Sequence, residues 1–277
     1  MDVPLNQVFF PATFQELFSA WEKFPDAVPF AGGTEIMRNQ GRRILKLPRN
    51  ILCLDKLSEL KRITRTERYL EIGAMVSLND IIYLGKVVPE AFARCLEGIA
   101  GPHVRNLATI GGNLCYKQRR LNAFAPMVAL DALFELRSKS SARWISASRF
   151  VSLVDNWSEY EIVSRIRVPL DQWDYSVYKK FNHQETDDRD GAAVFVLRNE
   201  KNILTDLRIV FAGKTVIRER NLESLLIGKS LPLAKKDVVA FVNRWEACLS
   251  GIHEISPLLR SGILIFIKSG VSVLTDI

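Results

Sequence analysis

Apolar side chains recur at helical spacing near the start of the chain. In residues 12–24, aromatic and leucine side chains fall three or four positions apart, which predicts an amphipathic helix. The apolar residues 27–33 then end in two glycines, as expected for a strand that leads into a turn. Further apolar runs predict strands over 50–57 and 68–78.

Two helices are expected next. Ser77 or Asn79 is a suitable cap for a helix over 80–88, because both side chains accept hydrogen bonds from backbone N–H groups. Pro89 stands where a first helical turn tolerates proline, so a second helix is expected from residue 90 to a glycine at 98 or 101.

The second half of the chain predicts strands first and helices last. A short helix over 125–132 leads into a strand over 133–138, and an alternating strand over 161–170 ends at Pro169. The following segments predict three strands, over 175–181, 191–199 and 203–213, and a hairpin turn at 199–202 joins the last two. Two helices are then expected over 221–228 and 234–251, the first capped by Asn221. This order predicts an α+β fold rather than one doubly wound parallel sheet.

Length and composition are those of an ordinary globular protein. The chain has 277 residues, enough for two domains that each bury a core. Its first ten residues lack the basic start and apolar core of a secretory signal, so none is expected. The unbroken apolar runs are short, as at 263–267, and no membrane insertion is expected.

Charge and cysteine content narrow the class of protein. The formal net charge is +7, yet the basic residues form short groups without interleaved aromatic side chains, so nucleic acid is not an expected partner. The four cysteines show no spacing that would place several ligands around one metal, so no metal site is expected. Reduced thiols in a cytoplasmic protein are the favoured interpretation, with disulfide or metal use as the alternative.

Two glycine pairs carry the strongest chemical signal. Residues 30–35 read FAGGTE and residues 109–113 read TIGGN, each after an apolar segment. A glycine pair lets backbone N–H groups converge on an anion, above all a phosphate. One such pair alone is typical of a plain turn, but two similar pairs suggest loops that close on a single pyrophosphate. Neither matches GxxxxGK[ST] or GxGxxG.

These glycine pairs belong to a wider resemblance. Residues 101–115, with 29–35, 70–81 and 164–170, closely resemble the FAD-binding medium subunit of molybdenum hydroxylases, the family of xanthine dehydrogenase and carbon monoxide dehydrogenase. The resemblance implies a domain over 1–172 with the fold shared by vanillyl-alcohol oxidase relatives (the PCMH type), in two sub-lobes of about 1–57 and 58–172. It also implies a second domain over 173–277, like the C-terminal domain of the carbon monoxide dehydrogenase flavoprotein.

The resemblance implies contacts to FAD at particular positions. Ile110 is expected to approach the flavin ring as well as the pyrophosphate. The residues expected to wrap the pyrophosphate are Ala31, Gly32, Gly33, Thr34, Glu35, Thr109, Ile110, Gly111, Gly112 and Asn113.

Other positions match less closely. The family's aspartate at the adenosine ribose falls on Asn122, which has no charge and follows an unusual KQRRL segment. Tyr178, Lys180 and Asp190 fit the family's aromatic, lysine and aspartate near the isoalloxazine, although Lys179 competes with Lys180. A lysine there would stabilise the anionic reduced flavin; a charged strand edge is the alternative.

The resemblance therefore implies an electron-transfer subunit, most closely of the xanthine dehydrogenase type. Electrons would come from a molybdopterin-binding large subunit through the [2Fe-2S] clusters of a small subunit, and FAD would pass them to NAD or another acceptor. Four scattered cysteines do not provide the usual ligand spacing of such a cluster. Two alternatives remain: a self-sufficient flavin oxidase, and a flavin-free interaction protein that kept the fold.

Overall fold

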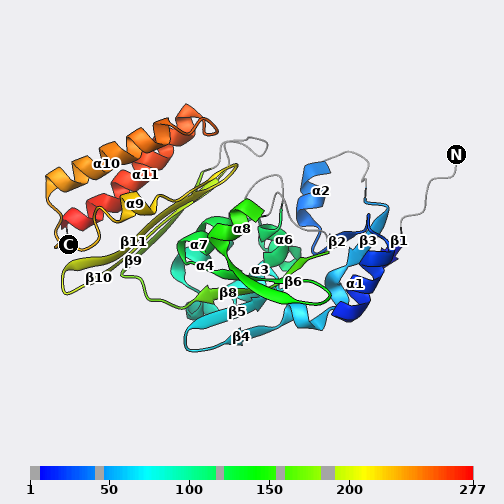
Figure 1. Ribbon diagram of the computed structural model, residues 1–277. Helices are drawn as coiled ribbons and strands as arrows, with labels where there is room; N and C mark the ends of the chain where they lie inside the picture. The colour runs from blue at the N-terminus through cyan, green and yellow to red at the C-terminus, as the bar shows by residue number, and fades with distance from the viewer. Residues whose placement is uncertain (1–6, 41–46, 117–121, 154–159, 182–190, 277) are drawn as a thin grey trace. The chain divides into compact units, whose positions relative to one another are not determined.

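The structure is a computed structural model that describes residues 7–40, 47–116, 122–153, 160–181 and 191–276 (Figure 1). By their contacts the residues form two compact units. Unit 1 comprises Met1–Gly85, Ala100–Cys115 and Ala132–Pro169, and unit 2 comprises Lys86–Ile99, Tyr116–Asp131 and Leu170–Ile277. Helices and mainly antiparallel sheets make up both units, so the predicted α+β class is confirmed. The domain boundary at residue 172 stays a prediction.

Unit 1 begins with a small parallel sheet covered by one helix. The strand order is β1, β3, β2, and helix α1 buries Leu17, Phe18 and Trp21 against it. Thr13 caps α1, because its side-chain oxygen accepts a hydrogen bond from the N–H of Glu16. Threonine is a preferred residue at this position of a helix. The elements are β1 (Gln7–Phe9), α1 (Phe14–Lys23), β2 (Val28–Phe30), α2 (Thr34–Gln40) and β3 (Asn50–Cys53).

An antiparallel five-stranded sheet forms the rest of the unit 1 framework. Its order is β4 (Ile63–Arg65), β5 (Tyr69–Gly73), β8 (Ile162–Pro169), β6 (Leu133–Arg137) and β7 (Ala142–Ser146). Alternate residues on one face are apolar and buried, whereas the opposite face carries Arg165 paired with Glu135 at 2.6 Å. Burial alone would raise the pKa of Glu135, but the hydrogen bonds from Arg165 and Ser164 hold it below the ordinary value.

Short helices complete unit 1, and two of them correct the sequence prediction. The side chain of Ser77 caps α3 (Leu78–Ile82), whereas Asn79 is buried and caps nothing. Residues 109–113 are expected as a loop, but residues 110–114 form α6 (Ile110–Leu114), capped by Thr109, and the preceding α5 (Pro102–Leu107) is a helix that the sequence does not predict. Neither helix is predicted from the sequence, because proline and adjacent glycines usually interrupt helical patterns. Helix α8 (Ala147–Leu153) lies beside β6 and β7.

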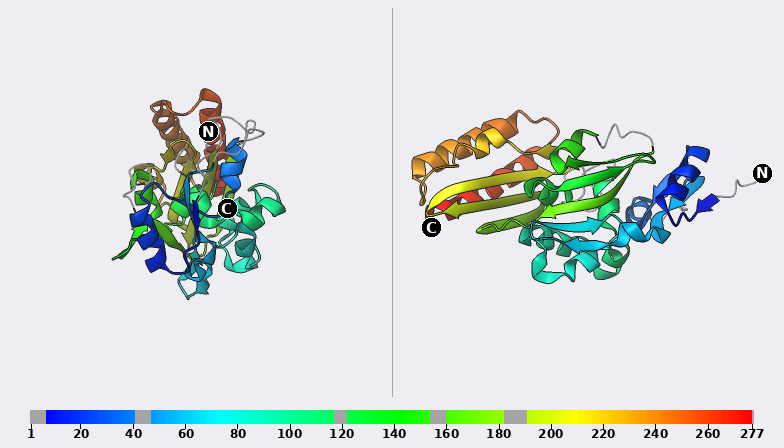
Figure 2. Two further views of the ribbon diagram at one scale, coloured as in Figure 1. Left: turned by 90° about the vertical axis from the view of Figure 1, so that its right-hand side faces the viewer. Right: turned by 60° about the horizontal axis from the view of Figure 1, so that its bottom comes forward.

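Unit 2 is a layer of helices on each face of a four-stranded antiparallel sheet. The sheet order is β12 (Val216–Ile217), β11 (Ile203–Ala212), β10 (Gly191–Glu200) and β9 (Tyr175–Phe181). Helices α10 (Lys235–Ser250) and α11 (Pro257–Asp276) lie together along one face (Figures 1 and 2). Helices α4 (Glu90–Glu97) and α7 (Phe124–Ala129) contact the same strands on the other face.

In unit 2 the sequence predicted a hairpin turn correctly and one helix cap wrongly. The β10–β11 hairpin forms at the expected turn, where Lys201 and Asn202 adopt positive φ angles. Helix α9 (Arg220–Glu223) instead begins one residue before Asn221, so the predicted cap is wrong; Glu219 occupies the N-cap position.

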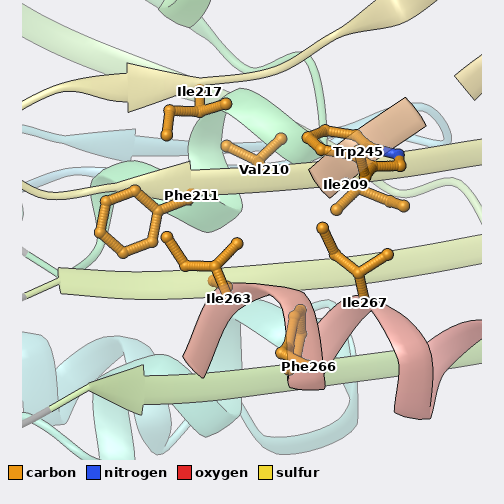
Figure 3. Close-up of a pocket in the computed structure, with 9 residues that line it drawn as sticks. Ile209, Val210, Phe211, Ile217, Trp245, Ile263, Phe266 and Ile267 are labelled. Carbon is orange, nitrogen blue, oxygen red and sulfur yellow. The ribbon is translucent and has the colours of Figure 1, made fainter. Parts of the chain in front are cut away.

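The apolar core of unit 2 is densely packed. Figure 3 shows the strand residues Ile209, Phe211 and Ile217 facing Trp245 of α10 and apolar side chains of α11. The space left between them is about 10 Å³, at most room for one water molecule, and its lining is apolar. It is a packing gap rather than a ligand site.

Helix α11 is the longest helix among the described residues. It is long and apolar enough, by length and composition alone, to cross a bilayer, which its short apolar runs had not suggested. Its buried side chains belong to the unit 2 core, as in a core helix of a globular protein: Ile263, Phe266, Ile267, Val271 and Leu274.

A network of buried charges joins α7 to the sheet of unit 2. The Arg218 guanidinium donates to the carbonyl oxygen of Val128 at 2.9 Å and to Asp131 at 2.6 Å, and lies 3.4 Å from Glu223. Burial raises the pKa of Glu223, while the N–H of Ile209 and the charge of Arg218 partly oppose this rise. Arg218 therefore holds the C-terminal end of α7 and compensates a buried carboxylate.

Candidate flavin-binding site

The two glycine segments lie against each other within unit 1. We call residues 31–35 loop 1 and residues 109–113 loop 2. A Cβ atom built on Gly32 would lie only 1.7 Å from the carbonyl oxygen of Leu107, and one built on Gly112 would lie 3.8 Å from the Cβ of Ala31. The fold thus brings together two segments that are more than seventy positions apart in the sequence.

Packing of the protein itself explains three of the four glycines. Gly32 is required by the Leu107 carbonyl, and a Cβ on Gly111 would lie 2.7 Å from the Cβ of Ala74. Gly33 has a φ of +67° and faces the Phe30 ring. Gly112 differs: it is exposed, and only the Thr109 hydroxyl, at 3.0 Å, would crowd a Cβ there. Of these four glycines, Gly112 is the one that leaves an open surface for a ligand.

Loop 1 provides unpaired hydrogen-bond donors. Among the residues that the structure describes, the backbone N–H groups of Gly32, Gly33 and Thr34 have no acceptor. The first residues of a helix lack acceptors within that helix, and Thr34 begins α2. Such N–H groups need water or an anionic ligand.

Loop 2 is different, because its backbone N–H groups have acceptors within the protein. Its N–H groups already donate within the protein: Ile110 to the Val76 oxygen at 3.1 Å, Gly111 to the Ala74 oxygen at 2.8 Å, and Gly112 and Asn113 to Thr109. The Ile110 side chain is also fully buried. Its approach to a flavin ring, and contacts of the loop 2 N–H groups with the pyrophosphate, stay predictions.

Charge near loop 1 is balanced. Glu35 would repel an anion at the start of α2, but Arg38 binds its carboxylate at 2.5 Å and 2.9 Å. Arg38 was missed as a site residue, although its position three residues after Glu35 is a signal that the sequence offers.

The remaining predicted residues belong to unit 2. Asn122 lies in the turn before α7, and Asp190 lies outside the described residues. Lys180 and Tyr178 project from the same face of β9 toward α4, whereas Lys179 projects from the other face. The Lys180 ammonium donates to the carbonyl oxygen of Gly98 at 3.3 Å, at the C-terminal end of α4. Because side chains alternate between the two faces of β9, Lys180 and Lys179 point to opposite faces. A contact of Lys180 with flavin stays a prediction.

Tyr178 lies over a buried thiol. Burial raises the pKa of Cys95 to about 12, and the Tyr178 hydroxyl and the Lys180 charge only partly oppose this rise. Burial likewise raises the pKa of Cys115, which follows loop 2, to about 12. Both thiols are therefore protonated at neutral pH and are poor nucleophiles.

Solved structures establish the class of fold. Quinoline 2-oxidoreductase from Pseudomonas putida 86 has a chain that matches with a TM-score of 0.81 and 21% identity, covering 100% of this chain and 99% of that one. Carbon monoxide dehydrogenase from Hydrogenophaga pseudoflava matches with a TM-score of 0.80 and 22% identity, covering 100% and 98%. The chain thus has the two-domain α+β fold found in these oxidoreductases.

The family follows from the sequence match. The family described as the FAD binding domain in molybdopterin dehydrogenase matches residues 4–171. The chain belongs to this family, and it is an FAD-binding subunit of an oxidoreductase of the molybdenum hydroxylase type. The resemblance seen in the sequence is confirmed, and so is its cofactor, FAD.

Curated relatives have different substrates in their names. The carbon monoxide dehydrogenase medium chain of Hydrogenophaga pseudoflava is 27% identical over 74% of this chain and 74% of its own length. The glyceraldehyde dehydrogenase medium chain of Sulfolobus acidocaldarius is 25% identical over 79% and 80%. Xanthine dehydrogenase 2 of Arabidopsis thaliana is 27% identical over 92% of this chain, which spans only 19% of that enzyme.

Proposed function

We propose that loop 1 holds the FAD pyrophosphate through the N–H groups of Gly32, Gly33 and Thr34, and that Gly112 of loop 2 lets the phosphates approach. The observation that carries this proposal is the pairing of the two loops in unit 1, with unpaired donors on one and an open glycine on the other. Ala31, Thr109 and Asn113 border this site, and Arg38 offsets the charge of Glu35.

In this proposal the chain passes electrons through FAD as one subunit of a larger complex. FAD, when bound, supplies the exchange of one or two electrons that links iron–sulfur clusters to a soluble acceptor. Two relatives are named as medium chains, which supports the presence of other chains in the complex. In this proposal these are a molybdopterin-binding large subunit and a [2Fe-2S] small subunit. The chain's own residues would bind and orient the flavin, with Asn122, Tyr178, Lys180 and Asp190 as further proposed contacts.

We assign the complex to the xanthine dehydrogenase type, with a purine as substrate, NAD as electron acceptor and a cytoplasmic location. Support comes from the xanthine dehydrogenase FAD-binding subunit of Escherichia coli O157:H7, 29% identical over 50% of this chain and 48% of its own length. The match to the carbon monoxide dehydrogenase medium chain is longer, and it favours a complex of the carbon monoxide dehydrogenase type. The substrate site lies on the large subunit in this scheme, so purifying the complex and testing both substrates decides between them.

Flavin titration of the purified chain tests the site. We expect the wild-type chain to take up FAD, with its visible spectrum perturbed, and to be reduced by NADH without oxygen. Gly112→Ala should weaken FAD binding at least tenfold, about 1.4 kcal/mol, because a methyl group fills the open surface. Its melting temperature should stay within about 3 °C of wild type, because alanine favours α6 while crowding the Thr109 hydroxyl only slightly.

The matched control is Gly101→Ala. Gly101 also lies in unit 1 beside a short helix, but nothing lies within 4 Å of an added Cβ. This variant should bind FAD like wild type. A chain that takes up no FAD would favour the flavin-free alternative, and equal FAD affinity in both variants would remove loop 2 from the site. Oxidation of a small organic substrate by the isolated chain would favour the self-sufficient oxidase.

A further inference from the structure

Asn79 is a buried polar residue that the proposed site does not use directly. Its side chain is 3% exposed, yet it does not cap the helix in which it lies. Its amide nitrogen donates to the carbonyl oxygen of Pro102 at 3.0 Å and to the side-chain oxygen of Asn106 at 2.5 Å. Its amide oxygen accepts from Nε of Arg105 at 3.1 Å. Three residues of one short helix are thus joined to one side chain.

The Asn79 contacts fix helix α5 at both ends. Pro102 begins this helix, while Arg105 and Asn106 lie in its last turn. Arg105 adds a hydrogen bond to the carbonyl oxygen of Ala100 at 2.8 Å, just before the helix. A six-residue helix has little stability of its own, so tertiary contacts decide where it lies. Asn79 and Arg105 supply polar contacts that are specific in direction.

Both glycine loops depend on the position of α5. Its last carbonyl oxygen, that of Leu107, occupies the space that a side chain on Gly32 would need, so loop 1 packs directly on it. Loop 2 starts two residues later, and the Ala108 oxygen accepts from the N–H of Leu78, the residue next to Asn79. A shift of α5 would therefore move the packing surface of loop 1 and the start of loop 2 together.

The geometry points to Asn79 as a positioning residue for the flavin site, acting through α5 on both loops. This inference rests on the proposed function, in which the loops hold the FAD pyrophosphate. Asn79 itself does not contact the cofactor in this account. Its removal should loosen residues 107–113 before FAD is added, and should weaken FAD binding as a consequence.

Amide hydrogen exchange of the flavin-free full-length chain, followed by mass spectrometry, tests this inference. In Asn79→Ala we expect residues 107–113 to exchange at least tenfold faster than in wild type, and the Kd for FAD to rise about tenfold. The matched control is Asn50→Ala, at the second buried asparagine among the described residues, which is 6% exposed and whose side-chain amide donates to Asp26 at 2.9 Å and 3.0 Å. It should lower the melting temperature without changing exchange in 107–113.

A milder variant covers the case in which Asn79→Ala does not fold. Asn106 is exposed, and Asn106→Ala removes one partner of Asn79 with little risk to the core. Exchange in 107–113 should then rise two- to fivefold. Unchanged exchange in every variant that folds would overturn the inference. If wild type binds no FAD, the proposed pyrophosphate site fails instead, while the exchange measurement still decides whether Asn79 positions the loops.

Discussion

Gly32→Ala should abolish measurable FAD binding and destabilise the chain by about 3 kcal/mol or more. The added Cβ would lie 1.7 Å from the Leu107 oxygen, 2.7 Å from its carbonyl carbon and 3.3 Å from the Ala108 nitrogen. All three atoms belong to the backbone, so no side-chain rotation relieves the overlap. Loop 1 would have to move away from α5, taking its unpaired N–H groups with it.

Urea unfolding and FAD titration of the same preparations measure this effect. Gly101→Ala is again the control, because it adds the same methyl group in unit 1 where nothing lies within 4 Å. It should lose no more than about 1 kcal/mol, because Gly101 is the N-cap of α5 and alanine is a poorer N-cap residue than glycine. If Gly32→Ala unfolds and binds FAD like this control, then the packing of loop 1 on α5 is wrong.

Arg218→Met should lower the free energy of unfolding by about 3–5 kcal/mol, which corresponds to a fall of roughly 10 °C in melting temperature. Arg218 is 10% exposed and Glu223 is 4% exposed, so water cannot replace the lost partner. The substitution removes the Arg218 guanidinium from the Glu223 carboxylate and from the carbonyl oxygen of Val128, while Asp131 keeps its ion pair with Arg208 at 2.9 Å. The buried Glu223 carboxylate would lose its ion-pair partner and keep the hydrogen bond from the N–H of Ile209 at 2.8 Å.

Arg220→Met is the control for the loss of a positive charge. Arg220 lies 3.5 Å from the same Asp131 oxygen, but its side chain is 69% exposed. Exposed ion pairs contribute little, so we expect a change within about 0.5 kcal/mol. Adding Glu223→Gln to Arg218→Met should recover part of the lost stability, since the amide needs no counter-charge. Equal unfolding free energies for the two arginine variants would contradict the role given to Arg218.

Local patterns were enough to predict most of the fold. Residues 14–23 form the expected helix because their apolar spacing and Thr13 cap act within a few positions. The hairpin at residues 199–202 was predicted for the same reason. Helices α5 and α6 were missed, since proline and glycine oppose helix formation and their stability comes from distant contacts such as those of Asn79.

The candidate site was predicted in outline and not in detail. The glycine pairs and the family resemblance pointed to two segments that the fold brings together, but all four glycines were interpreted as space for a ligand. Leu107, Ala74 and Phe30 fill three of these spaces, and no short-range pattern indicates such contacts. The same holds for the N–H groups of Ile110 and Gly111, whose acceptors at Val76 and Ala74 lie more than thirty positions away.

A crystal structure of the chain with FAD would show whether loop 1 holds the pyrophosphate. We predict pyrophosphate oxygens within about 3.2 Å of the backbone N–H groups of Gly32, Gly33 and Thr34, the range of an N–H···O hydrogen bond. The phosphates should pass over Gly112, with the loop 2 N–H groups still bonded to Val76, Ala74 and Thr109. A pyrophosphate bound elsewhere on the chain, or one held mainly by loop 2 N–H groups, would contradict the proposed site.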